Sequence, residues 1–150
     1  MKVLVQRSLK SNVSVNNKIV GSIDKGLVLF VGFTKNDTLE NIEYLVKKII
    51  NMRIFDDENG IMNKSILDIK GKILSISQFT LYADTKKGNR PSYINALNSE
   101  EASILYDKFN QELKKYIDVE TGIFGSDMKV NITNDGPVTI MLESRDKNEG

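Results

Sequence analysis

The stretch that decides the fold is KILSISQFTLYAD, residues 72–84. Its first half mixes isoleucine and leucine with serine directly after Gly71, which predicts a short buried strand that begins at a turn. Its second half sets three polar side chains around an aromatic ring: Ser77, Gln78, Phe79 and Thr80. Hydroxyl and amide groups at the end of a central strand are costly to bury without hydrogen-bond partners. They therefore either cap a turn and bond to nearby backbone, or form the floor of a functional site.

The composition limits the chemistry that such a site can use. The 150 residues contain neither cysteine nor histidine, which excludes disulfides, thiol nucleophiles and histidine bases. The net charge of +1 gives no general attraction to polyanions, so a nucleic acid would have to contact a local basic patch. The opening MKVLVQRSLK is too short an apolar run for a signal peptide, and no segment approaches ~20 apolar residues. We therefore expect a cytoplasmic protein with no membrane segment.

Most of the remaining chain has the pattern of β-strands. Near the N-terminus, short apolar runs at residues 3–5, 13–15 and 19–20 predict a meander of three strands. The run GLVLFVGF, residues 26–33, is almost wholly apolar and predicts a central strand covered on both faces. Other expected strands lie at residues 53–56, 119–124, 128–133 and 138–143, with a turn at residues 134–137.

Two segments have the spacing of amphipathic helices. The first has an apolar stripe from Leu39 to Ile50, preceded by Asp37 and Glu40 as a capping-box pair. The second covers residues 99–116, with Asn98 and Glu101 as its capping-box pair. The expected buried stripe of this second helix is Ala102, Leu105, Phe109, Leu113 and Tyr116.

These elements predict a mixed α/β (α+β) fold in a single domain, residues 1–150. It would contain one strongly curved mixed β-sheet with two main helices on one face. The charged tail, residues 144–150, is expected to be frayed.

Two polar loops are candidates for function. The acidic turn at residues 57–60 lacks the full spacing of a calcium loop, so we expect no metal there. The loop at residues 85–92 is basic, and beside a site its Lys86, Lys87 and Arg90 would suit phosphate contacts. Taken alone, it has the composition of a solvated surface loop.

Four stretches together resemble one protein family: SQFTLYAD, KKGNRPSY, FGSDMKVNITNDGPVTI and the opening KVLVQR. The family is that of the D-aminoacyl-tRNA deacylases, also called D-tyrosyl-tRNA(Tyr) deacylases. The resemblance covers residues 1–143 in order, and SQFTL with NDGPVT at this separation is a specific pair. The sequence departs from the family pattern at Ser8 and Leu9, and at Tyr93, where the family often has Phe.

The resemblance implies an enzyme that hydrolyses the ester between a D-amino acid and tRNA, a chiral proofreading activity. It implies that Ser77, Gln78, Phe79 and Thr80 line the pocket for the aminoacylated 3′ adenosine, with Met128 close to it. Gly136 and Pro137 would be joined by a cis bond and would reach into the pocket of the other subunit of a homodimer. Arg7 would hold that dipeptide in orientation, and no metal or organic cofactor would be needed.

The residues themselves are compatible with this role. An aminoacyl ester is already activated, so the enzyme must mainly position water and stabilise an oxyanion, for which the N–H groups near Phe79 and Thr80 would serve. The ribose 2′-hydroxyl of the tRNA would assist proton transfer. A rigid Gly-Pro pair would reject L side chains by collision and let glycyl-tRNA pass.

Three alternatives stay open from the residues alone. One is a non-catalytic RNA-binding module that uses the basic loop, although the chain has no array of aromatic residues for base stacking. Another is an acyl-ester hydrolase with Thr80 as nucleophile, although no base pairs with it in the sequence pattern. The third is a structural dimer subunit.

Overall fold

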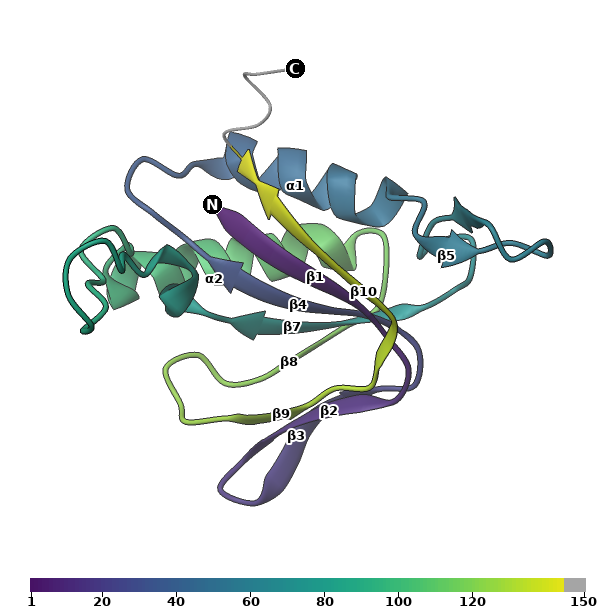
Figure 1. Cartoon of the computed structure of the whole chain (residues 1–150), viewed down its shortest axis with the longest axis horizontal. Helices are drawn as coiled ribbons and strands as arrows, with labels where there is room; N and C mark the ends of the chain where they lie inside the picture. Colours follow the sequence, from purple (N-terminus) through teal and green to yellow (C-terminus); the bar gives the residue numbers. More distant parts are fainter. Residues whose placement is uncertain (145–150) are drawn as a thin grey trace.

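A five-stranded mixed sheet forms the centre of the computed structural model, which describes residues 1–144 (Figure 1). The elements in chain order are β1 (Lys2–Ser8), β2 (Ser11–Val15), β3 (Lys18–Ile23), β4 (Gly26–Gly32), α1 (Leu39–Asn51), β5 (Phe55–Asp56), β6 (Met62–Lys64), β7 (Lys72–Ser77), the 3-10 helix η1 (Phe79–Tyr82), α2 (Ser99–Lys114), β8 (Val119–Thr121), β9 (Lys129–Asn131) and β10 (Asn134–Glu143). The central sheet has the strand order β10-β1-β4-β7-β8. Its β4–β7 and β7–β8 pairs are parallel, and its two pairs with β1 are antiparallel.

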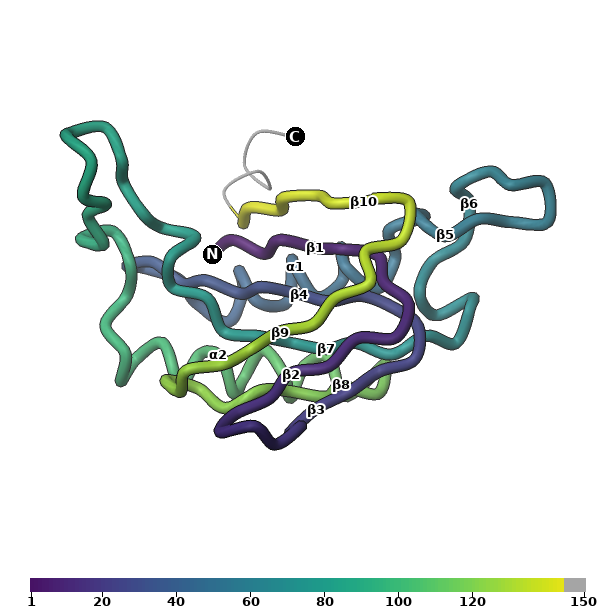
Figure 2. Tube along the Cα trace, turned by 60° about the horizontal axis from the view of Figure 1, so that its bottom comes forward, coloured from purple at the N-terminus to yellow at the C-terminus, as the bar shows by residue number. Residues whose placement is uncertain are grey.

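The remaining strands form two smaller sheets, in the orders β3-β2-β9 and β5-β6. The mixed α+β class is confirmed, but the expectation of one curved sheet is wrong. The expected N-terminal meander is also wrong, because its strands belong to two different sheets. β1 pairs with β4 and β10, whereas β2 leaves the central sheet and pairs with β3 and β9. The three-stranded sheet thereby covers the β4 and β7 part of the face that the helices leave free, while the described residues leave β1 and β10 uncovered on that face (Figure 2).

Both helices pack on one face of the central sheet, as predicted. The apolar stripe of α1 meets that of α2 and the inward side chains of β1 and β4 in the larger core cluster. Val28, Leu74 and Ile76 point the other way and pack against Val13 and Ile23 of the smaller sheet. β4 is therefore covered on both faces, which explains why its sequence is a continuous apolar run.

The start of α1 differs from the prediction in its cap and in its first apolar residue. The N-cap of α1 is Thr38, whose backbone N–H donates to Asn41 Oδ1 at 2.8 Å. Asp37 is not part of a capping box with Glu40, because its carboxylate accepts from Thr34 N–H and from the Met1 ammonium. Leu39 is 51% exposed and lies off the buried stripe. The N-cap of α2 is confirmed, since Asn98 Oδ1 accepts from Glu101 N–H at 2.9 Å, but Glu101 Oε2 accepts from the Asn98 side-chain amide, which is not the bond of a capping box.

The end of the second helix was also predicted too late. α2 ends at Lys114, so Tyr116 lies beyond it and is 46% exposed rather than buried. Ser144 is not frayed, because it is 2% exposed and its N–H donates to the Met1 carbonyl at 2.9 Å. The rest of the expected tail, residues 145–150, lies outside the described residues.

The predicted turn at residues 134–137 is part of strand β10, which begins at Asn134. In the pairing with β1, Thr139 lies opposite Gln6 and Asn134 lies opposite Ser8. Residues 135–138 therefore lie opposite the single residue Arg7. The three extra residues form a large bulge on the edge strand β10. The sequence correctly predicted a break in regular structure here. The break is a bulge and not a turn, because strand β10 pairs with β1 on both sides of it.

Candidate functional site

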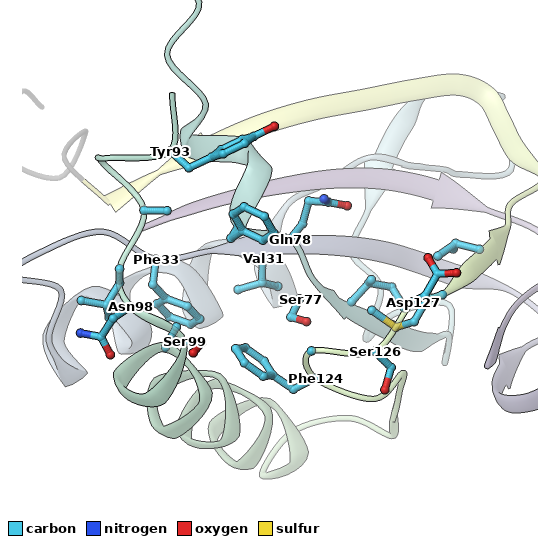
Figure 3. A pocket seen from close by; sticks show the side chains of 18 residues that line it. Val31, Phe33, Ser77, Gln78, Tyr93, Asn98, Ser99, Phe124, Ser126 and Asp127 are labelled. Carbon is cyan, nitrogen blue, oxygen red and sulfur yellow. The ribbon is translucent and has the colours of Figure 1, made fainter. Parts of the chain in front are cut away.

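A cavity of about 630 Å³ opens where β4 and β7 end, beside the start of α2 (Figure 3). Four segments supply its walls: residues 31–33 at the end of β4, residues 76–79 at the end of β7, residues 93–102, and residues 124–130. Its lining is largely apolar, with the polar groups of Ser77, Gln78, Asn98, Ser126 and Asp127 among the exceptions. An apolar hollow with a few convergent polar groups is the usual form of a small-molecule or substrate site.

The turn after β7 leaves two backbone donors without a partner in the short helix η1. Gln78 N–H donates to the Val31 carbonyl at 2.7 Å, which continues the β4–β7 pairing by one more residue. The chain then enters η1, where the first helical bond is donated by Leu81 N–H to the Gln78 carbonyl. The N–H groups of Phe79 and Thr80 precede that bond, so they have no partner inside the helix. Such N–H groups can stabilise negative charge.

Two exposed aromatic rings frame the mouth of the cavity. Phe79 and Tyr93 pack edge to face with ring centroids 5.0 Å apart and an interplanar angle of 70°. They are 56% and 42% exposed, respectively. Because both rings line the cavity, an incoming planar group would meet aromatic surface there.

A buried hydrogen-bond network supports the inner wall. Phe124 lines the cavity and packs against Tyr106, whose ring centroid is 5.9 Å away. Tyr106 donates its hydroxyl hydrogen to the Ser75 carbonyl at 2.7 Å, and Gly122 N–H reaches the same oxygen at 3.4 Å. Burial raises the pKa of the Tyr106 hydroxyl above its ordinary value. The network thus joins α2, β7 and the segment that follows β8.

Met128 lines the same cavity as three other predicted site residues. It lines the cavity with Ser77, Gln78 and Phe79, so the structure brings these four predicted residues together. A Cβ added at Gly122 would lie 2.5 Å from Met128 Sδ, so the glycine leaves room for the methionine side chain.

Thr80 and the basic loop do not line the cavity. Thr80 is exposed on η1, and its hydroxyl accepts a hydrogen bond from the Gln78 amide. Lys86, Lys87 and Arg90 are exposed on residues 85–92, which the contact between Asp84 and Ser92 closes into a loop. The loop ends next to Tyr93, which lines the cavity, but its charged side chains are not part of the lining.

The dipeptide Gly136-Pro137, called the gate dipeptide below, has a cis peptide bond. Both residues are exposed and lie outside the cavity lining of their own chain. Gly136 has φ of +124°, a conformation that L side chains rarely adopt. An added Cβ there would also lie 3.0 Å from Arg7 Nη2.

Arg7 contacts the residue that precedes the gate dipeptide. It is 8% exposed, and its Nε donates to the carbonyl of Asp135, the residue before Gly136, at 3.1 Å. Its Nη1 donates to the Ile54 carbonyl at 2.9 Å and to Asp56 Oδ1 at 3.4 Å. A buried guanidinium with several acceptors is fixed in orientation.

Sequence analysis missed much of the cavity wall. It did not single out Asn98 and Ser99 as site residues, nor Phe124, Ser126 and Asp127. Asn98 was recognised only as a helix cap, and Phe124, Ser126 and Asp127 lie in the FGSD segment of a quoted motif. The available signal was that motif, a polar segment between two short strands. In the part of the chain that the structure describes, no group of three or more acidic, histidine or cysteine residues could hold a metal ion.

No helix within residues 1–144 is both long enough and apolar enough to span a bilayer.

Comparison with known proteins places the chain in one family. The family model for D-Tyr-tRNA(Tyr) deacylase matches residues 4–143. A D-aminoacyl-tRNA deacylase of Clostridium botulinum (strain 657 / Type Ba4) is 59% identical over 146 residues, which are 97% of this chain and 98% of the relative. The chain therefore belongs to the D-Tyr-tRNA(Tyr) deacylase family, a family of hydrolases.

Two solved structures share the fold. The c-Myc DNA Unwinding Element Binding Protein superposes with a TM-score of 0.91 at 39% identity, over 95% of this chain and 98% of its own. A probable eukaryotic D-amino acid tRNA deacylase superposes with a TM-score of 0.80 at 19% identity, over 94% and 97% of the two chains. The second likeness, at this identity, concerns the fold alone.

Proposed function

We propose that this protein hydrolyses the ester bond of D-aminoacyl-tRNA and releases free D-amino acid and tRNA. The observation that carries the proposal is the cavity at the end of β7, with Ser77, Gln78, Phe79 and Met128 in its lining, in a chain of this family. In the proposal, the 3′ adenosine enters past Phe79 and Tyr93, and the aminoacyl ester reaches the turn between β7 and η1. Because that substrate is tRNA, we place the activity in the cytoplasm.

The chemistry needs little from side chains. Water attacks the ester carbonyl, and the N–H groups of Phe79 and Thr80 stabilise the oxyanion that forms. The ribose 2′-hydroxyl passes the proton from the attacking water toward the 3′ oxygen that leaves. This assignment is supported by the position of both N–H groups ahead of the first helical bond of η1. No cofactor takes part in the proposed reaction.

The gate dipeptide acts in the cavity of a second subunit. Its exposure, and its place outside the cavity of its own chain, support a site that two copies share. A further support is the apolar row that Met141, Leu4 and Phe30 form across β10, β1 and β4, where Leu4 lies opposite both of the others. Met141 is 44% exposed, and Leu4 and Phe30 are partly exposed. We therefore propose a homodimer that forms over this face.

Chirality is read by exclusion in this arrangement. The backbone of the gate dipeptide occupies the space that an L side chain would need, and a D side chain points away from it. Glycine has no side chain to exclude, so glycyl-tRNA should also be hydrolysed. Complete resistance of glycyl-tRNA, under conditions that clear the D-ester, would count against the gate.

The basic loop supplies the contacts to the rest of the tRNA 3′ end. Lys86, Lys87 and Arg90 are exposed on the loop that precedes Tyr93, where they can pair with phosphates. A purely RNA-binding module would use the same loop without hydrolysis. The largely apolar cavity with a few polar groups favours catalysis over that alternative.

The deciding experiment compares the release of D-tyrosine and L-tyrosine from matched charged tRNAs. We expect rapid hydrolysis of the D-ester and a rate for the L-ester near that of the uncatalysed reaction. Equal rates for the two esters would contradict the gate. Retention of charged tRNA on a filter with no hydrolysis would favour the binding module.

A further inference from the structure

The gate dipeptide is connected to the β5–β6 hairpin through one buried guanidinium. Arg7 Nη1 contacts the base of the hairpin, at the Ile54 carbonyl and the Asp56 carboxylate. On its other side, Arg7 Nε contacts both the carbonyl of Asp135 at 3.1 Å and its carboxylate at 3.4 Å. Arg7 therefore lies between two carboxylates that belong to separate elements.

Of the three acidic residues in the hairpin, Asp56 is the one that contacts Arg7. Its neighbour Asp57 stabilises the hairpin turn. Asp57 Oδ1 accepts hydrogen bonds from Asn59 N–H at 2.8 Å and from Ile61 N–H at 3.1 Å. These backbone bonds hold the pKa of Asp57 below its ordinary value. Glu58 pairs instead with Lys64 at 3.0 Å.

The carboxylates of Asp56 and Asp135 attract the Arg7 guanidinium from two sides. If Asp56 lost its charge, the guanidinium would keep the Ile54 carbonyl on the hairpin side but only one ion-pair partner, Asp135. Opposite charges attract, so removal of one of the two carboxylates leaves the attraction to the other unopposed. Arg7 would then be drawn toward Asp135, and Nη2 already lies close to Gly136. The position of the gate dipeptide would shift with it.

We propose that Asp56 is a positioning residue for the gate dipeptide, acting through Arg7 to set how strictly L-esters are excluded. The inference rests on the proposed function of the gate. Exclusion by collision is sensitive to small displacements, since site geometry must be held within about 0.5 Å. Asp56 should therefore affect the selectivity between D and L esters more than it affects the rate with the D-ester.

The test measures kcat/KM for D-tyrosyl-tRNA and L-tyrosyl-tRNA with Asp56→Asn and with a matched control, Glu58→Gln. Both changes remove one negative charge from the same hairpin, but Glu58 contacts Lys64 and not Arg7. We expect Asp56→Asn to raise the ratio of L to D hydrolysis by roughly 3- to 10-fold, the range of a partly exposed charged hydrogen bond. Glu58→Gln should leave the ratio unchanged within about twofold.

A double-variant comparison separates positioning from loss of stability. Arg7→Gln should raise the L to D ratio, and adding Asp56→Asn to it should change the ratio no further, because Asp56 acts through Arg7. Asp56→Glu, which keeps the carboxylate, should restore most of the selectivity. A loss of folded protein would lower both rates in the same proportion and leave the ratio constant.

The outcomes distinguish this inference from the function on which it rests. A wild-type enzyme that does not discriminate D from L would overturn the gate, and the role of Asp56 with it. A discriminating wild type whose ratio is the same in Asp56→Asn and Glu58→Gln would overturn the role of Asp56 alone. Independent, additive effects of Arg7→Gln and Asp56→Asn would do the same.

Discussion

The Thr80 hydroxyl separates two ways of hydrolysing an ester. It accepts a hydrogen bond from the Gln78 amide, and the hydrogen bonds of the described residues give it no carboxylate or lysine as a base. Removal of a true nucleophile typically lowers kcat by 10⁴ or more. We expect Thr80→Ala to retain at least about a tenth of the wild-type kcat, because water attacks the ester directly.

Rapid-quench measurement of D-tyrosine release checks this, with Thr80→Ser as the control that keeps a hydroxyl. The two variants should behave alike. A burst of acyl-enzyme that is present in the wild type and in Thr80→Ser but absent from Thr80→Ala would support a threonine nucleophile instead.

Tyr106 gives the fold a stability that depends on pH. Burial raises the pKa of its hydroxyl above 10.0, so the folded state holds the proton more tightly than the unfolded state. The resulting stabilisation is fully present below pH 10.0 and is lost as the pH rises through the higher pKa of the folded state. Tyr106→Phe should lower the free energy of unfolding at pH 8 by about 1 kcal/mol, the value of the hydrogen bond to Ser75.

Urea unfolding between pH 8 and 11 checks the sign. The wild type should lose stability above pH 10 more steeply than Tyr106→Phe, so the two curves should converge. Tyr116→Phe serves as the control, because Tyr116 is 46% exposed and removing its hydroxyl should leave the wild-type curve unchanged. Parallel curves for the wild type and Tyr106→Phe would show that the buried hydroxyl does not titrate in this range.

Among the elements, the basic loop at residues 85–92 carries the predicted contacts to tRNA. We expect Lys86→Ala, Lys87→Ala and Arg90→Ala together to raise KM for D-tyrosyl-tRNA several-fold and to leave kcat little changed, because they remove contacts outside the cavity. The dependence of KM on salt should also weaken, since each lost phosphate contact reduces the slope by about 0.7.

Three lysines beside the starts of β4 and β7 provide a matched control for that triple variant. Lys25, Lys70 and Lys72 lie at or before the start of β4 and β7, whereas the cavity lies at the ends of these strands. Replacing these three lysines by alanine removes the same charge from the opposite end of the sheet. An equal rise in KM in both triple variants would mean that total charge, rather than the loop, attracts the tRNA.

For the molecule as a whole, the proposed dimer depends on the row formed by Met141, Leu4 and Phe30. We expect Met141→Glu to give a monomer by sedimentation velocity, because a carboxylate without a partner is costly to bury in an interface. Deacylation should be lost with the dimer. Ile104→Glu is the control, since Ile104 is 53% exposed on α2, away from that face. A Met141→Glu monomer with full activity would contradict a shared site.

Mixing two inactive chains tests the shared site directly. Gly136→Ala should misplace the gate dipeptide, because the added Cβ would approach Val138 and Arg7 within about 3 Å at a φ unsuited to alanine. Ser77→Phe should fill the cavity and leave the gate dipeptide intact. Each variant alone should be inactive, and a mixture that exchanges subunits should regain up to a quarter of wild-type activity, because half of the dimers form mixed and carry one complete site of two. No recovery in a mixture shown to exchange would place both parts of the site in one chain.

Much of this protein could be read from its sequence because the signals are local. The apolar stripes of α1 and α2, the buried runs of β4 and β7, and the cap at Asn98 each depend on residues a few positions apart. The segment Ser77–Thr80 was recognised as a candidate floor because polar groups at a strand end need partners, and three of its four residues line the cavity. The family was readable for a similar reason, since its motifs are short and keep their order.

The tertiary structure alone decided how these parts are joined. It separated β1 from β2, made a bulge of residues 135–138, and assembled the cavity wall from Asn98 and Phe124, which are distant in the sequence. It also placed Asp56 beside Arg7, a contact across 49 positions. Strand pairing and side-chain contacts of this kind are chosen by competition among distant segments for the same backbone partners and the same core space. No local pattern records that choice, because each segment alone is compatible with several partners.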